Sequence, residues 1–182
     1  MTKVFIGGSR KVARISSPVR QRLDRIIDRG LQVLVGDANG ADKAVQRYLG
    51  SRRYERVEVF CTNGICRNNI GNWPVRAVPA PGTARGFTFY VVKDEQMTRE
   101  ASVGFMLWDG ASRGTVANIE RLLDGHKKVL VYSAPTGRFL TFRNKQEWEA
   151  FHGTRHKGIP QKAKRTARLA QESLDTARVA LF

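Results

Sequence analysis

The sequence predicts an α/β fold, a doubly wound parallel sheet of about five strands with a basic C-terminal helical extension. Short runs rich in apolar and β-branched residues alternate with segments of helical periodicity between residues 3 and 132, which is the pattern of a parallel sheet covered by helices. Turns rich in Gly, Ser, Asp and Asn follow three of the predicted strands. The 182 residues suffice for one such domain and a short appendage, without disulfides to support the core.

Two strand–loop–helix units occupy the first fifty residues. A strand at residues 3–6 ends in Gly7-Gly8-Ser9-Arg10, and the first helix begins at Ser17-Pro18, with Ser as N-cap and Pro in the first helical position. A second strand at residues 31–35 leads through the turn at 36–42 into the second helix, whose apolar residues recur at helical spacing. Right-handed crossovers place both turns at the same edge of the sheet.

The rest of the chain continues this alternation with one interruption. Residues 62–85 contain Gly, Pro and Asn and little periodicity, so we expect a long irregular loop there. Residues 138–142 are expected to form a strand or the arm of a hairpin, and residues 145–151 a short helix with Trp148 packed inward. The other expected elements are strands at 57–60, 104–108 and 127–132 and helices at 93–102 and 115–123. These elements divide the chain into an α/β domain at 1–133, a β/α extension at 134–160 and a basic helix at 161–182.

The run from Trp108 to Thr115 carries the strongest functional signal. It leaves an apolar strand, passes through a turn bracketed by Gly110 and Gly114, and enters a segment with helical periodicity. Such a turn, at the carboxyl end of a parallel strand and the amino end of a helix, is where α/β sheets bind phosphate-bearing ligands. Together with the turns after the first two strands, it predicts a single crevice that accepts a ligand of nucleotide size.

The charge and the cysteines limit the class of protein. A formal net charge of +16 at pH 7 exceeds what solubility requires and makes nucleic acid an alternative partner, although aromatic residues do not alternate with the basic ones as a stacking surface would require. No apolar run reaches the roughly 20 residues that span a bilayer, and the first residues resemble a strand instead of a signal peptide. We therefore expect a cytoplasmic protein without a membrane partner, in which Cys61 and Cys66 are structural thiols and no metal is bound.

Four segments, taken in order, resemble one family. They are Gly7-Gly8-Ser9-Arg10; Gly36-Asp37-Ala38-Asn39-Gly40-Ala41-Asp42; Lys93-Asp94-Glu95-Gln96-Met97; and Trp108-Asp109-Gly110 with Ser112-Arg113-Gly114-Thr115. Residues 1–133 are thereby similar to the YspA-like branch of the SLOG superfamily, which also contains the LOG-type nucleotide phosphoribohydrolases and the DprA-type DNA-binding proteins. The resemblance implies a Rossmann-like domain that binds a nucleotide or a nucleotide-derived signal. We expect no cofactor.

The turn chemistry gives each of these residues a physical role. Glycines let backbone amides approach phosphate or ribose, hydroxyl groups donate hydrogen bonds, and Arg or Lys supplies a cation. The predicted ligand-binding residues are Gly7, Gly8, Ser9, Arg10, Gly36, Asp37, Gly40, Asp42, Lys93, Asp109, Gly110, Ser112, Arg113, Gly114 and Thr115. For any single glycine, plain turn geometry is an equally good explanation.

Catalysis stays open, because the chain departs from its enzymatic relatives at Asn118. The LOG-type hydrolases carry a catalytic Glu three residues after the Thr of this motif, and an amide cannot act there as general base or nucleophile. Glu120 lies about 200° further around the helix and points elsewhere. Cleavage of an N-glycosidic bond requires a carboxylate close to the ribose, which makes Asp109, Asp94 and Asp37 the candidate catalytic residues. Asp109, at the carboxyl end of a strand, is the best placed of them. For Asp109, bracing of the loop is the alternative role.

A weaker similarity concerns the same turn. An Asp-Gly pair before a Gly-Thr turn also resembles the nucleoside deoxyribosyltransferases, at the level of the fold alone. If the protein is an enzyme, the sequence therefore predicts a phosphoribohydrolase-like or a deoxyribosyltransferase-like reaction.

The C-terminal segment changes character. Residues 155–168 contain six basic and no acidic residues, and Ala and Leu then recur in steps of four and three up to Leu181, which is the spacing of a coiled coil. We expect this helix to pack on its own domain or on a second copy, in a homo-oligomer. Two functions stay open: binding of a nucleotide-type ligand, as a sensor or as an N-glycosidase, and binding of nucleic acid through the basic surface and tail. The three Gly-rich turns favour the first, because the second gives them no purpose.

Overall fold

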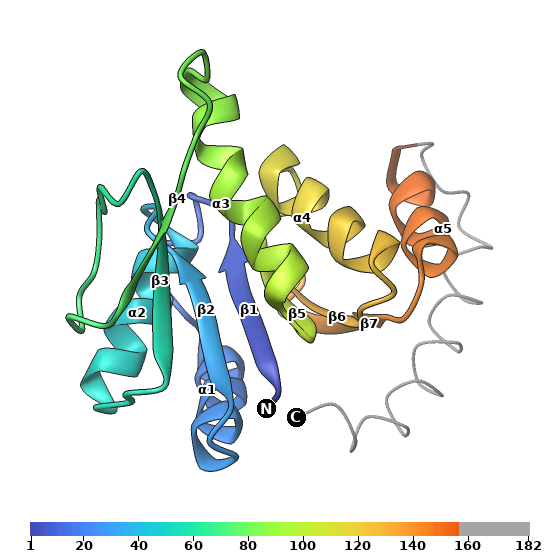
Figure 1. Cartoon of the computed structure of the whole chain (residues 1–182). Helices are drawn as coiled ribbons and strands as arrows, with labels where there is room; N and C mark the ends of the chain where they lie inside the picture. Colours follow the sequence, from blue (N-terminus) through green and yellow to red (C-terminus); the bar gives the residue numbers. More distant parts are fainter. Residues whose placement is uncertain (157–182) are drawn as a thin grey trace.

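The computed structural model describes residues 1–156, which form a seven-stranded sheet with helices on both faces (Figure 1). The strand order is β4-β3-β2-β1-β5-β6-β7. Neighbouring strands are parallel except β6 and β7, which are antiparallel. The predicted Rossmann-like α/β class is confirmed, although the sheet is larger than the five strands expected.

The elements follow the predicted alternation closely. The strands are β1 (Lys3–Gly8), β2 (Gln32–Gly36), β3 (Val57–Thr62), β4 (Val75–Val78), β5 (Val103–Trp108), β6 (Val129–Ser133) and β7 (Arg138–Phe142). The helices are α1 (Ser17–Asp28), α2 (Ala41–Ser51), α3 (Gly86–Glu100), α4 (Arg113–Asp124) and α5 (Lys145–His156). The expected hairpin arm is β7, which pairs with β6 and so continues the same sheet.

Two hydrophobic cores lie on opposite faces of the sheet, because successive strand residues point to opposite sides. Val4 and Ile6 pack with the apolar residues of α1 and α2. Phe5, between them in the sequence, packs with those of α3 and α4. Trp148 of α5 is fully buried in this second core, as predicted. Each face therefore has its own layer of helices, which is the doubly wound arrangement.

The strand order explains where a ligand site forms. From β1 the chain proceeds outward to β2, β3 and β4, and then returns to place β5, β6 and β7 on the other side of β1. The loops that leave β1 and β5 therefore diverge from neighbouring strands. In open α/β sheets, ligands bind at the carboxyl ends of the strands at such a switch point.

Three expectations about local structure are wrong. Residues 62–85 are not irregular throughout, because they contain β4, and α3 begins at Gly86, earlier than the expected residue 93. The first helix has Ser16 as its N-cap, one residue before the expected Ser17.

The two cysteines differ from the expectation as well: Cys61 and Cys66 form a disulfide and are not free thiols. Asn63 and Gly64 both adopt positive φ and reverse the chain between them. This reversal brings the Cα atoms of the two cysteines to 5.1 Å, within the range that a disulfide spans.

Two further findings concern the predicted partners. No helix within residues 1–156 is both long and apolar enough to cross a membrane. The basic helix predicted at 161–182 lies outside the described residues.

Candidate ligand-binding site

A cavity of about 560 Å³ opens at the carboxyl edge of the sheet, beside the ends of β1 and β5. The loop after β1, the start of α2, helix α3 and the first turn of α4 form its walls. The predicted site residues that line it are Gly7, Gly8, Ser9, Arg10, Asp42, Lys93, Asp94, Asp109, Ser112, Gly114 and Thr115. Gly36, Asp37, Gly40, Gly110 and Arg113 are not among its lining residues.

The floor of the cavity consists of backbone at the end of β1. A Cβ atom on Gly8 would overlap the carbonyl group of Leu107 in β5, so the two strands approach there more closely than a side chain allows. The amide of Ser9 donates to the same carbonyl oxygen at 2.9 Å. Gly7 and Gly8 also line the cavity and have no side chain, so a ligand can contact the main chain there.

Gly40 has a structural role outside the cavity. Its φ of +84° lies in the region that favours glycine, and a Cβ there would overlap the backbone of Arg10. The neighbouring amide of Ala41 donates to the carbonyl oxygen of Ser9 at 3.1 Å. Gly40 thus lets the turns after β1 and β2 pack against each other, which is the plain turn geometry considered above.

Asp109 braces the turn that leads into α4. Its Oδ1 accepts hydrogen bonds from the amides of Ala111 (3.1 Å) and Ser112 (2.7 Å). Partial burial raises the pKa of Asp109, but these hydrogen bonds and one from Ser9 outweigh it and hold the pKa below its usual value. Ser112 is the N-cap of α4 and accepts from the amide of Thr115. The carboxylate is therefore ionised and fixes the geometry of the turn.

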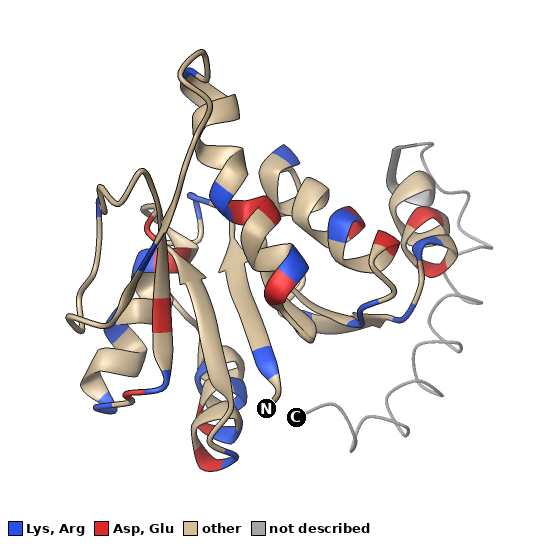
Figure 2. Cartoon of the chain, in the orientation of Figure 1, with Lys and Arg blue, Asp and Glu red and all other residues tan. Residues whose placement is uncertain are grey.

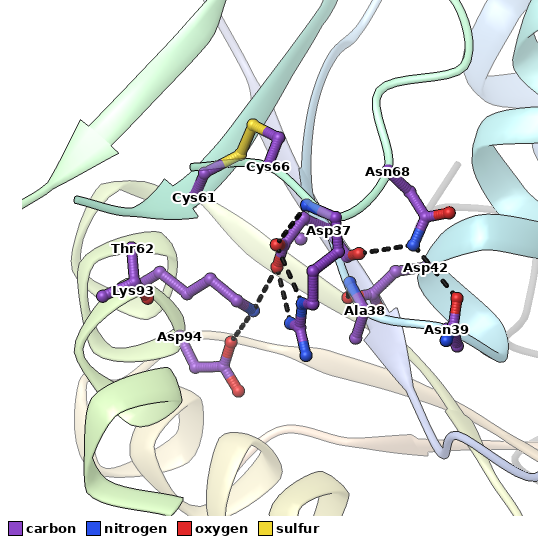
Figure 3. Close-up of polar contacts among 12 residues, drawn as sticks. Asp37, Ala38, Asn39, Asp42, Cys61, Thr62, Cys66, Asn68, Lys93 and Asp94 are labelled. Carbon is purple, nitrogen blue, oxygen red and sulfur yellow. Dashed lines mark hydrogen bonds and ion pairs between the residues drawn. A yellow bond between two sulfur atoms is a disulfide. The ribbon is translucent and has the colours of Figure 1, made fainter. Parts of the chain in front are cut away.

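A cluster of charged groups lies between α3 and the end of β2, with buried Lys93 at its centre (Figure 3). The Nζ atom of Lys93 donates to Asp94 Oδ1 at 2.7 Å and lies 3.7 Å from Asp37 Oδ1. Asp37 also receives a bidentate pair of hydrogen bonds from the guanidinium of Arg67. The cluster joins three segments that are distant in sequence, and it positions α3 against the turn after β2.

The cluster shifts the pKa values of Asp37, Lys93 and Asp42. Burial raises the pKa of Asp37, but the hydrogen bonds from Arg67 and the charge of Lys93 outweigh it, so the pKa lies below its usual value. Burial lowers the pKa of Lys93, but Asp94 and Asp42 outweigh it and the pKa is raised. For Asp42 burial dominates, and its pKa rises to about 7.

Asn118 and Glu120 occupy different environments on α4. The Asn118 amide donates to Asp94 Oδ2 at 3.2 Å and lines the cavity. Glu120 accepts a hydrogen bond from the indole of Trp148 and so faces α5, away from the cavity, as the helical spacing predicts. Asp94 is thus held by Lys93 on one oxygen and by Asn118 on the other.

The sequence interpretation missed an aromatic and cationic wall. Phe87 and Tyr90 of α3 line the cavity, and Arg67 reaches it from the loop after β3. The Arg67 guanidinium lies 4.1 Å from the centroid of the Tyr90 ring, a cation–π contact. Phe87 is 64% exposed. The run Phe87-Thr88-Phe89-Tyr90 is the signal that could have located this wall.

These features define a class, a Rossmann-like α/β protein with a cavity at the switch point of its sheet. Within residues 1–156 no group of three or more His, Cys, Asp or Glu side chains could hold a metal ion. Comparisons of the chain with protein-family models, with curated proteins and with solved structures found no match.

Proposed function

We propose that the protein binds a nucleotide or a nucleotide-derived ligand in the cavity at the carboxyl edge of the sheet. One observation carries the proposal: the loop after β1, the first turn of α4 and the aromatic side of α3 meet at a single cavity of about 560 Å³. A volume of this order is typical of small-molecule sites. The first two parts suit the phosphate of a nucleotide, and the third suits its base.

The phosphate fits between the loop after β1 and the start of α4. The first amides of a helix have no acceptor within the helix and carry a partial positive charge. Gly114 lies in this first turn, and Ser112 adds a hydroxyl group at the cavity wall. Arg10 and Lys11 line the cavity as exposed cations, so an entering anion meets positive charge before it meets the backbone.

The base fits against Phe87. An exposed aromatic ring at the wall of a cavity offers a face on which a planar base can stack. A Cβ atom on Gly114 would lie 4.0 Å from the Phe87 ring, so the ring and the first turn of α4 are neighbours. A ligand that places its phosphate at α4 can therefore reach Phe87 with its base.

The motif order supports the same ligand class. The resemblance of residues 1–133 to the YspA-like branch of the SLOG superfamily rests on the turns that line the cavity and on Lys93-Asp94 of α3. Because the structure brings parts of all four segments to one cavity, we propose membership of this superfamily.

Asp94 is the carboxylate that suits an N-glycosidase. Asp109 Oδ1 already braces the turn before α4, whereas Lys93 and Asn118 hold Asp94 in a fixed orientation at the cavity. An amide at position 118 keeps Asp94 free of the like-charge repulsion that a Glu there would impose. A sensor and an enzyme would use the same binding site, and in the enzyme alone Asp94 would contact the ribose.

Calorimetry and base release with AMP, ADP-ribose and NAD test the proposal on the full chain. Gly114→Val places a branched side chain in the cavity, and we expect it to weaken binding at least 10-fold. Gly153→Val on α5, where a Cβ atom would meet nothing within 4 Å, is the matched control and keeps the affinity. If the wild type releases free base and Asp94→Asn does not, the protein is an enzyme. If the wild type binds the nucleotide without releasing base, it is a sensor.

Two outcomes would overturn the proposal. Equal affinity of the Gly114→Val and Gly153→Val variants would remove the first turn of α4 from the site. Absence of binding to every nucleotide, together with salt-dependent binding to DNA of unrelated sequences, would establish the alternative of a nucleic-acid-binding protein.

A further inference from the structure

Asp42 is the carboxylate without a cationic hydrogen-bond donor in the charged cluster. The cluster holds three carboxylates, those of Asp37, Asp42 and Asp94, and two cations, Lys93 and Arg67. Arg67 and Lys93 pair with Asp37, and Lys93 hydrogen-bonds to Asp94. Within residues 1–156, the hydrogen-bond donor to Asp42 is the backbone amide of Ala38, at 3.2 Å. One retained proton makes the cluster neutral, and Asp42 is the group that gains most by holding it.

The two oxygens of Asp42 face different surroundings. Oδ2 accepts from Ala38 and lies close to Gly36, where an added Cβ atom would be 2.5 Å from it and 2.8 Å from Lys93 Nζ. Oδ1 lies toward Gly7 of the cavity floor, 3.7 Å from the position of an added Cβ. A proton on Oδ1 is therefore placed on the side of the carboxyl group that faces the floor of the cavity.

The surroundings of Asp42 make its charge state matter to a ligand. The side chain lines the cavity although only 7% of the residue is exposed. The charged groups around the cavity come from each neighbouring element: Lys93 and Asp94 from α3, Asp37 after β2, Arg67 after β3, Arg10 and Lys11 after β1, and Asp109 after β5. Of the three carboxylates that line the cavity, Asp94 and Asp109 each accept at least two hydrogen bonds within residues 1–156, whereas Asp42 accepts one. The negative charge of ionised Asp42 would therefore be the least compensated of the three.

We propose that Asp42 is a ligand-binding residue that acts in its protonated form, donating a hydrogen bond from its carboxyl group to an anionic ligand, and that its ionisation expels that ligand. This inference rests on the proposed function. It assigns to the site a preference for anionic ligands at neutral and slightly acidic pH. The raised pKa of Asp42, about 7, places the change within the physiological range.

The test is calorimetry with ADP-ribose across the neutral range. Its pyrophosphate diester does not titrate there, so a pH dependence of its binding reports on the protein. In the wild-type protein we expect the dissociation constant to rise above pH 7, approaching about 10-fold per pH unit. Asp42→Asn cannot ionise and can still donate through its amide, so we expect it to bind at alkaline pH as the wild type binds at acidic pH. Asp28→Asn on the exposed side of α1 removes the same charge elsewhere and keeps the wild-type profile.

Carboxyl carbon NMR of Asp42, assigned by its loss in Asp42→Asn, gives a second readout that does not depend on a ligand. Titration of Asp42 in its ordinary acidic range would overturn the inference, whatever the binding results. Equal affinity of wild type and Asp42→Asn at every pH would overturn it as well and leave the proposed function standing. Absence of ADP-ribose binding at all pH values would count against both proposals.

Discussion

Lys93 determines how charge is arranged behind the cavity. Its side chain is 3% exposed, and it contacts carboxylates from the turn after β2 and from its own helix. A sequence-based interpretation could place Lys93 and Asp94 near the site from their order in the motif. It could not foresee that Asn118 would orient Asp94, since that contact joins residues on two helices that meet only in the folded chain.

Asp42 and Asp37 contribute in opposite senses to the pH dependence of the free energy of unfolding. The pKa of Asp42 is raised from 3.8 to about 7. The stabilisation that its carboxyl group gives to the folded state is therefore fully present below about pH 4 and is lost as the pH rises through 7. This loss is on the order of 4 kcal/mol in the free energy of unfolding. The lowered pKa of Asp37 acts in the opposite sense and below pH 4. We predict that the wild-type free energy of unfolding, measured in urea, falls between pH 5 and 8 relative to that of Asp42→Asn. Parallel profiles for the two proteins would contradict this prediction.

Phe87 gives a prediction about the ligand's base. Because we propose that the ring stacks on the base, we expect Phe87→Ala to weaken the binding of AMP about 10-fold or more, in line with about 1–3 kcal/mol per stacked base. Binding of ribose 5-phosphate should stay unchanged, and Phe87→Trp should retain the affinity for AMP. Competition calorimetry measures all three. A parallel loss for AMP and ribose 5-phosphate would mean that Phe87 shapes the cavity without stacking.

Among the elements, α3 and the loop before it were the hardest to predict. The first turns of α3 contain Gly86, two Phe and β-branched residues, which have low intrinsic helix propensity. Tertiary contacts support them instead: Thr62 donates to the carbonyl oxygen of Phe89, and Arg67 covers the Tyr90 ring. Strand β4 escaped prediction because three of its four residues are exposed, so it lacks the alternation of a half-buried strand.

The disulfide fixes the segment that carries Arg67. Cys61 is the next-to-last residue of β3, and Cys66 directly precedes Arg67. The side chain and the backbone amide of Arg67 both donate hydrogen bonds to Asp37. Closing so short a loop should stabilise the fold by about 2 kcal/mol. We predict that a dithiol reductant lowers the free energy of unfolding by this amount in the wild type. The Cys61→Ala/Cys66→Ala variant should start from the lower value and show no response to the reductant; a wild type that does not respond would contradict the prediction.

For the whole molecule, the alternation of strands and helices was enough to predict the class of fold and the edge at which the predicted turns meet. The sheet is wider than expected because β4 and β7 extend it at both ends. Basic residues lie on helices and loops on both faces of the sheet (Figure 2). Within the described part of the chain, the basic residues behind the net charge of +16 are therefore spread over the surface and do not define a binding site for a polyanion. The cavity is the more specific indication, and it favours a small ligand.

Removal of residues 161–182 separates ligand binding from self-association. The cavity is lined by residues between Phe5 and Asn118, so we predict that the truncated protein binds AMP as tightly as the full chain. We also propose that the segment joins copies of the chain, because its Ala and Leu repeat at coiled-coil spacing. Light scattering should then report a smaller assembly after truncation. An unchanged mass would exclude the segment from the interface.

The close approach of Gly8 to Leu107 has a consequence for redesign of the site. A floor made of main chain presents the same surface whatever side chains surround it, and the contact with Leu107 leaves no room for a side chain at Gly8. A change of ligand specificity must therefore come from substitutions of the exposed side chains around the cavity. Lys11, Phe87 and Ala111 line the cavity and are exposed, so a library randomised at these three positions would sample new specificities on an unchanged anchoring surface.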